Sequence, residues 1–382
     1  VSDNRLLMER YQPNDPAFLR IVGYREFLHT LLYQSKSNYD RFFQQSENWL
    51  HRLEKVRSSS PSVNASLAEI HLYRSLLATH FTEYKSAAFE LYDSYKILSR
   101  SGSKLNPADV NKLSGIIGVL LQQVPEQYIK YLRAVGVKPS GLRGLDGLKQ
   151  YYTAAMPGSA DKIEGYLLII TALKEFGKEP ADAWHFIRKE GLLMLDNPFI
   201  KYQSALAALK AGDCASAVHL LDYGPHDKMP AAVPYWNYQL GRCKLYQNDP
   251  VAVTYFEKFL DRPGGDNYRH RVLLMTGWSY LIHNQPVKAK EYFQRVLTLS
   301  EPLTEFDQQA VREVKSGMMP DPGVVRARLL FDGGYYDSCQ LVCDRLIQSG
   351  TFSGAGKGEL IYRKARCEQR LGKDALAINS YL

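Results

Sequence analysis

Small and apolar positions recur at a regular spacing in the C-terminal half of the chain. One small residue recurs every 36 to 50 positions, a second follows it after 11 or 12, and a larger side chain stands four residues later. Positions i and i+4 share one face of a helix, so each copy predicts paired helices. The first small residues are Ala205, Gly241, Gly277, Ala327 and Ala365, the second are Ala217, Ala252, Ala289, Cys339 and Ala377, and the larger ones are Leu221, Phe256, Phe293, Cys343 and Tyr381.

A helix breaker separates the two small residues of every copy. Gly, Asn and Pro end one helix and open the next, so each copy predicts helix, tight turn and helix. The breakers are Gly212-Asp213, Asn248-Asp249-Pro250, Asn284-Gln285-Pro286, Gly333-Gly334 and Gly372-Lys373. Antiparallel helices approach closely where a small residue faces a bulky one, so these positions predict the contact line inside each hairpin. Ser75, Ala87 and Leu91 repeat the spacing upstream.

This pattern resembles the tetratricopeptide repeat, a helix-turn-helix unit of about 34 residues. Gly277-Trp278-Ser279-Tyr280, with Ala289 and Phe293, carries the closest match. The resemblance implies an all-α fold, a right-handed superhelix (α-solenoid) of stacked helix-turn-helix hairpins. The longest interval between first small residues, 50 positions from Gly277 to Ala327, contains extra residues at about Ser300 to Met319. Within them, Leu303 to Val311 predicts an inserted helix.

The helical pattern is longer and less regular upstream of residue 198. Gly and Pro are concentrated from Ser101 to Gly158, where they interrupt the repeat spacing. We therefore divide the chain into irregular N-terminal helical repeats over 1–100, a Gly/Pro-rich helical connector over 101–160 and a tetratricopeptide stack over 161–382. The inserted helix lies near 300–320 in this division. No strand-like alternation persists anywhere, which predicts an all-α protein.

A narrower resemblance covers residues 62–382. Its motifs are the Gly-spaced apolar segment Lys112 to Leu121, then Val124-Pro125, Leu132 to Gly136 and Gly144 to Leu148. These resemble the tetratricopeptide repeat protein 39 branch with its fungal inclusion-body clearance relative, and the chain is also similar to bacterial envelope proteins of the same architecture. The eukaryotic branch implies a link to lipid and mitochondrial outer-membrane biology.

Composition and charge exclude several classes of protein. The 382 residues are 45% hydrophobic and 23% charged, which is typical of a folded, soluble chain. The longest strongly apolar run, Tyr166 to Leu173, is far shorter than the roughly 18 to 20 residues of a membrane-spanning helix. The net charge of +8 is scattered, without a run of five basic residues, so we do not expect nucleic-acid binding. Peripheral membrane or lipid association stays open.

The termini and the resemblance bear on the compartment. The chain begins at Val1 rather than Met, so either a signal peptide has been removed or residues are missing. We favour a periplasmic or cell-envelope location over a cytoplasmic one. The last copy stops at Leu382, just past Tyr381, so either the native chain continues or a partner covers that end.

No motif indicates catalysis, and we expect no catalytic residue, no metal and no cofactor. Five cysteines are an odd number and predict buried packing rather than a disulfide framework. Gly354 to Gly358 resembles a phosphate-binding loop, but Thr351 and Gly358 stand where Gly and Ser or Thr are required, so a flexible loop is predicted.

The remaining chemistry is recognition. First helices line the concave groove in stacked hairpins, so residues three before and one after each first small residue should face it. The candidate binding residues are Tyr202, Tyr238, Arg242, Trp278, Arg328, Tyr362 and Arg366. Tyr, Trp and Arg dominate binding hot spots. We predict a non-enzymatic scaffold for a protein or peptide partner. The alternative is a lipid-like or other small hydrophobic ligand held inside the superhelix, where Gly115 and Gly118 either admit a neighbouring helix or line an acyl-chain groove.

Overall fold

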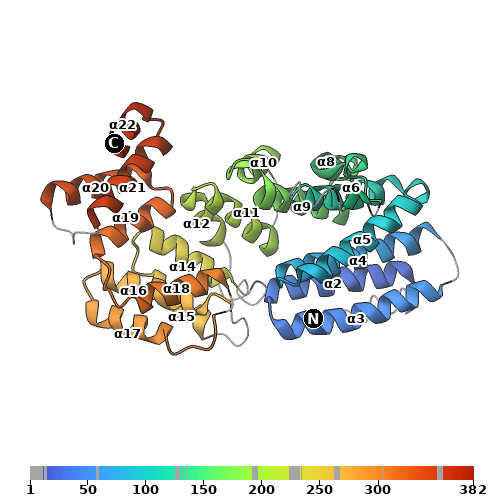
Figure 1. Ribbon diagram of the computed structural model, residues 1–382, viewed down its shortest axis with the longest axis horizontal. Coiled ribbons are helices and arrows are strands. Elements are labelled where there is room, and N and C mark those ends of the chain that lie inside the picture. The colour runs from blue at the N-terminus through green and yellow to red at the C-terminus, as the bar shows by residue number, and fades with distance from the viewer. Residues whose placement is uncertain are drawn as a thin grey trace. The chain divides into compact units, whose positions relative to one another are not determined.

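A computed structural model describes most of the chain. The described residues are 12, 15–56, 60–124, 130, 132–134, 136–191, 197–222, 233, 235–261, 267–302, 304–350 and 356–382. They form α-helices and short 3-10 helices, and no strand occurs among them. The chain divides into two compact units, residues 1–178 and 179–382 (Figure 1). Across the described ranges, no helix combines the length and the apolar character needed to cross a membrane.

The first unit is a series of helices in which each packs on its neighbours in sequence. Its helices are α2 (Pro16–Tyr33), α3 (Lys36–Lys55), α4 (Pro61–His80), α5 (Tyr84–Ser101), α6 (Pro107–Leu121), α8 (Gly144–Ala154) and α9 (Ala160–Phe176), with 3-10 helices at Gly102–Lys104 and Pro139–Gly141. α4 and α6 are the most buried of these helices. Ser60 and Asn106 cap them, each accepting a backbone N–H bond, and a proline follows each cap.

A buried ionic cluster ties four helices of this unit together. Glu69 on α4 is fully buried and contacts both Arg20 and Lys112, with 2.9 Å between Lys112 Nζ and Glu69 Oε1. Lys112 also lies 2.7 Å from Glu164 on α9, and Arg20 lies 2.6 Å from Asp109 on α6. Buried charges persist only when each is paired in this way, so the cluster specifies how α2, α4, α6 and α9 meet.

The second unit is a row of antiparallel helical hairpins. After α10 (Asp182–Glu190) the pairs are α11 (Pro198–Lys210) with α12 (Cys214–Asp222), α14 (Trp236–Tyr246) with α15 (Ala252–Leu260), α16 (Arg269–Ile282) with α17 (Pro286–Val296), α19 (Pro322–Asp332) with α20 (Tyr336–Ser349), and α21 (Gly356–Arg370) with α22 (Asp374–Tyr381). One further helix, α18 (Glu305–Lys315), lies in the 50-residue interval and packs on α16 and α17. The architecture is therefore the predicted all-α solenoid.

The predicted contact line lies inside these hairpins. All ten small positions are buried, and so are the larger residues Leu221, Phe256, Phe293 and Cys343. A Cβ atom at Gly241 would lie 2.6 Å from the Phe256 ring, and one at Gly277 would overlap the Phe293 ring. Tyr381 differs, because it is 45% exposed on the terminal hairpin.

First helices of successive hairpins also pack on one another, and the row curves toward them. α14 contacts α16 and also α19, which is the first helix of the hairpin after α16 and α17. The turns that follow α14 and α19 also meet, since Gln247 Nε2, just after α14, donates a hydrogen bond of 2.9 Å to the Oη atom of Tyr335, the N-cap residue of α20. First helices of hairpins that are not consecutive can approach in this way only on the inner side of a curved row. We call the face carried by α14, α16, α19 and α21 the inner face.

Two sequence expectations need qualification. The flexible loop predicted at Gly354 to Gly358 is wrong in part, because Gly356 begins α21 and its first turn includes Lys357 and Gly358. Gly354 and Ala355 lie outside the described residues. Pro125, in the Val124-Pro125 motif, Val135 and Leu303 also lie outside them.

Candidate functional site

The seven candidate residues occupy the first helices, at different depths. Arg242, Arg328 and Arg366 are half-buried, and Tyr362 is exposed. Three aromatic side chains are buried in packing contacts: Tyr202, Tyr238 and Trp278. Tyr202 stacks on Trp236 with 6.2 Å between ring centroids, and Tyr238 stacks on Tyr268 at 4.9 Å. These two tyrosines contribute to the core of the hairpin row.

Two guanidinium groups lie close to the Trp278 ring. The Arg271 guanidinium carbon is 5.1 Å from the indole centroid, and that of Arg328 is 4.7 Å from it. Both distances fall within the range of cation–π attraction. Arg271 comes from the same helix two turns earlier, whereas Arg328 comes from α19. The packing of α19 on α16 therefore brings Arg328 to the indole beside Arg271.

These arginines have few negative partners. Arg328 pairs with Glu313 at 3.4 Å. Arg271 is buried, and its Nη1 has no hydrogen-bond partner among the described residues. Arg242 donates hydrogen bonds to Gln239 and to the Tyr246 hydroxyl, both uncharged. A buried or half-buried guanidinium group loses hydration, and this loss is not offset when no carboxylate pairs with it. A bound anion would offset it through charge-assisted hydrogen bonds.

Asp332, the last residue of α19, is an acidic residue on which several of these arginines act. The residue is exposed to solvent. Protein packed around its carboxyl group removes part of the hydration of that group, and this desolvation raises the pKa of Asp332. The positive charges of four arginines act in the opposite direction: Arg328, Arg363, Arg271 and Arg242. The four arginines come from α14, α16, α19 and α21, first helices that each contact the next one along the row.

The last two candidates form a separate contact. Arg366 Nη1 donates a hydrogen bond of 3.0 Å to the Tyr362 hydroxyl on the same helix, and its guanidinium lies 5.5 Å from the Phe331 ring. Sequence spacing placed both on this face, and it also places Arg271 near them, because Arg271 stands seven residues before Trp278 on the same helix face. Arg363 and Asp332 were not among the candidates.

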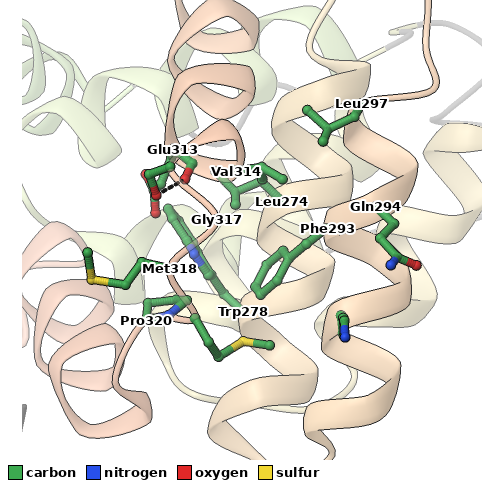
Figure 2. Close-up of a pocket in the computed structure, with 13 residues that line it drawn as sticks. Leu274, Trp278, Phe293, Gln294, Leu297, Glu313, Val314, Gly317, Met318 and Pro320 are labelled. Carbon is green, nitrogen blue, oxygen red and sulfur yellow. Dashed lines mark hydrogen bonds between the residues drawn. The ribbon is translucent and has the colours of Figure 1, made fainter.

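An apolar pocket adjoins Trp278. It has a volume of about 400 Å³ and is lined by α16, α17, α18 and the segment that follows α18. Figure 2 shows Trp278 between Phe293 and the Met318–Pro320 segment, with Val314 and Leu274 beside it. Glu313, the partner of Arg328, also lines the pocket. The Trp278 side chain therefore lines the pocket and also contacts Arg271 and Arg328.

The helix α18 is held in place by one buried carboxylate. Asp307 Oδ2 accepts a hydrogen bond of 2.8 Å from the Tyr268 backbone N–H, and Oδ1 accepts one of 3.0 Å from the Arg271 backbone N–H. Asp307 also bonds Thr304, the N-cap residue of α18. The Asp307 carboxylate thus caps the N-terminus of α16, while the Thr304 hydroxyl caps α18 and donates to the same carboxylate, so one side chain links the two helix ends.

The glycines of α6 serve helix packing. A Cβ at Gly118 would lie 2.6 Å from the Gly144 backbone nitrogen, and one at Gly115 would lie 2.7 Å from Leu148. The neighbouring helix α8 therefore occupies the space beside them. The pocket beside Gly118 and Leu121 has about 200 Å³, below the roughly 300 to 1,000 Å³ typical of ligand pockets.

The cysteines are free and buried, as the sequence predicted. Cys339 Sγ donates to the Ala327 carbonyl oxygen at 3.1 Å, inside the hairpin contact line. Within the described ranges, no cluster of three or more His, Cys, Asp or Glu side chains could hold a metal ion.

Comparisons with known proteins give little further information. No protein-family model matches the chain, and no curated protein matches it. A solved structure titled as a monomeric mutant of IFIT1 with Gppp-AAAA is similar at 13% sequence identity and a TM-score of 0.35, over 96% of this chain and 89% of that chain. The assignment as an all-α array of helical hairpins therefore rests on the helix packing described above.

Proposed function

We propose that this protein is a non-enzymatic scaffold that binds a protein or peptide partner through acidic residues of that partner. The binding surface is the inner face of the second unit. The observation that carries the proposal is the Trp278 ring in cation–π contact with both Arg271 and Arg328, together with Arg242, whose hydrogen bonds among the described residues go to the uncharged Gln239 and Tyr246. Arginine and tryptophan are residue types that dominate binding energy, and the buried Trp278 is reached through the pocket that it lines.

The charge balance favours an acidic partner over a neutral one. Arginine presents several donors in a plane and binds carboxylates in pairs of hydrogen bonds. Here the guanidinium groups are already oriented by rings and amide oxygens, so little side-chain freedom is lost when a ligand binds. Asp332 and Glu313 offset only part of the positive charge.

The test is a pull-down from cell extract with the wild type and the double variant Arg242→Glu plus Arg328→Glu. Arg41→Glu plus Arg52→Glu, on α3 of the first unit, is the matched control. We expect a partner that is retained by the wild type and the control and lost from the first variant. Retention by all three proteins would place recognition elsewhere.

A small hydrophobic ligand is the alternative that the same preparation can test. Native mass spectrometry of the purified protein should give the mass of the chain alone. A reproducible extra mass of a few hundred daltons that extracts as a lipid would overturn the peptide proposal.

A further inference from the structure

We propose that the pocket under α18 receives a large apolar side chain from the same acidic peptide that contacts the arginines. This inference rests on the proposed function and adds an anchor to it. The occupant is a peptide segment with an acidic residue next to Phe, Leu, Ile or Trp.

Continuity of the surface supports this occupant. Arg328 packs on the Trp278 ring and pairs with Glu313, while Trp278 and Glu313 both line the pocket. A carboxylate that meets Arg328 therefore stands next to the pocket, within the reach of the neighbouring residue of an extended peptide. The arginines supply charge complementarity for the acid, and the pocket supplies burial for the adjoining side chain.

The size and lining of the pocket suit a side chain. A volume of about 400 Å³ accepts one large apolar group together with part of its backbone. Met318 and Met319 are 72% and 44% exposed at its edge. Methionine side chains are flexible and polarizable, and such surfaces adapt to more than one apolar group. Lys290 and Gln294 add polar groups to the lining.

One unsatisfied donor lies on the Trp278 side chain. Trp278 Nε1 is buried and has no hydrogen-bond partner among the described residues. A buried donor of this kind is destabilising until an acceptor arrives. A peptide carbonyl oxygen entering beside the anchor would provide one, after displacement of the exposed methionine side chains.

The experiment begins with a phage-displayed library of random dodecapeptides selected on the full chain. The enriched sequence is then synthesised with a fluorescent label, together with a version in which its apolar residue is alanine. Binding is measured by fluorescence anisotropy to the wild type and to three variants. Gln294→Trp covers the pocket from an exposed lining position, and Gln308→Trp is the matched control on an exposed position of α18 outside the lining. Arg242→Gln plus Arg328→Gln reports on the charged contacts.

We expect enriched peptides with an acidic residue beside a large apolar one. Gln294→Trp and the alanine peptide should each weaken binding by about 10- to 100-fold, which corresponds to loss of one buried side chain. Combined, they should weaken it no further, because both remove the same contact. Gln308→Trp should leave affinity unchanged.

The possible failures are distinguishable. Binding that depends on the arginines but is unchanged in Gln294→Trp would overturn the anchor and leave the proposed function standing. Enriched peptides that ignore the arginine variant would overturn both. If sodium dodecanoate binds the wild type, is excluded by Gln294→Trp and does not compete with the peptide, the pocket belongs to a free amphiphile and the anchor is wrong.

Discussion

Glycine at the hairpin contact line is the residue on which close helix packing depends. Gly277 on α16 faces the Phe293 ring, and Gly241 on α14 faces Phe256 in the same way. Because each ring occupies the space of a missing Cβ, helix spacing and ring position are coupled. A residue with low helix propensity is kept in mid-helix for this reason.

Gly277→Ala should therefore destabilise the protein by about 1 to 3 kcal/mol, the usual effect of overpacking a dense core. The gain in helix propensity, about 1 kcal/mol, only partly offsets it. The comparison is Gly358→Ala in the first turn of α21, where an added Cβ meets nothing within 4 Å. Urea unfolding followed by tryptophan fluorescence should show Gly358→Ala equal to or more stable than the wild type. Equal stability losses in both variants would contradict the contact-line interpretation.

Three aromatic candidates are buried, whereas the three candidate arginines are half-buried. Spacing from Gly241 and Gly277 correctly placed Tyr238, Arg242 and Trp278 on first helices, because that spacing depends only on the helical repeat. It could not show that Tyr238 stacks on Tyr268, which stands 30 residues later. How deeply a residue lies in a groove depends on neighbouring helices, and their approach is set by contacts between distant positions.

Among the elements, the inserted helix α18 is attached by a few strong contacts. The Asp307 carboxylate accepts three hydrogen bonds at the two helix ends, and Ala310 is buried. Most other residues of this short helix are exposed or half-buried. Its position should therefore depend on the Asp307 carboxylate more than on apolar burial.

Asp307→Ala should release α18 from α16 and abolish the pocket. Loss of hydrogen bonds from a buried carboxylate typically costs about 1.5 to 3 kcal/mol each when the donors stay unsatisfied. Amide hydrogen exchange should accelerate in 305–315 and in the first turn of α16. Glu305→Ala, an exposed acidic residue in the same first turn, is the control and should leave exchange in α16 unchanged. Unchanged protection in Asp307→Ala would show that apolar contacts hold the helix.

The ionic cluster performs a comparable role for α2, α4, α6 and α9. Burial alone raises the pKa of Glu69, but Lys112 and Arg20 lower it to about 2. A carboxyl group whose pKa is lower in the folded state stabilises that state above its ordinary value of 4.5. This contribution decreases as the pH falls from 4.5 toward about 2.

Glu69→Gln should cost about 3 to 5 kcal/mol near neutral pH, because it leaves Lys112 and Arg20 with one carboxylate fewer in a buried site. The variant should also lose the part of the acid sensitivity between pH 4.5 and 2 that comes from Glu69. Urea unfolding across this range measures both effects. Glu54→Gln, exposed on α3, should behave as the wild type. A Glu69→Gln protein with the acid sensitivity of the wild type would contradict this assignment.

At the scale of the molecule, the chain contains separate cores. One cluster joins Phe42, Leu53, Ile70 and Leu77 within the first unit, and another joins Ala327, Cys339, Cys343 and Leu360 within the second. The hairpin pattern was predictable from sequence because each hairpin encodes its own turn and contact line. The division at residues 178 and 179 was not, because no change in composition or periodicity marks it.

The arrangement of the cores predicts that residues 179–382 fold and bind on their own. Every residue of the arginine group and the pocket belongs to this unit, and hairpin arrays are stabilised by contacts between neighbouring repeats. The isolated unit should give a helical circular-dichroism spectrum, a cooperative thermal transition and the partner affinity of the full chain within about threefold. Its Arg242→Glu plus Arg328→Glu version supplies the binding control. A folded fragment that no longer binds would mean that the first unit contributes to recognition directly, and the inner face would then be only part of the site.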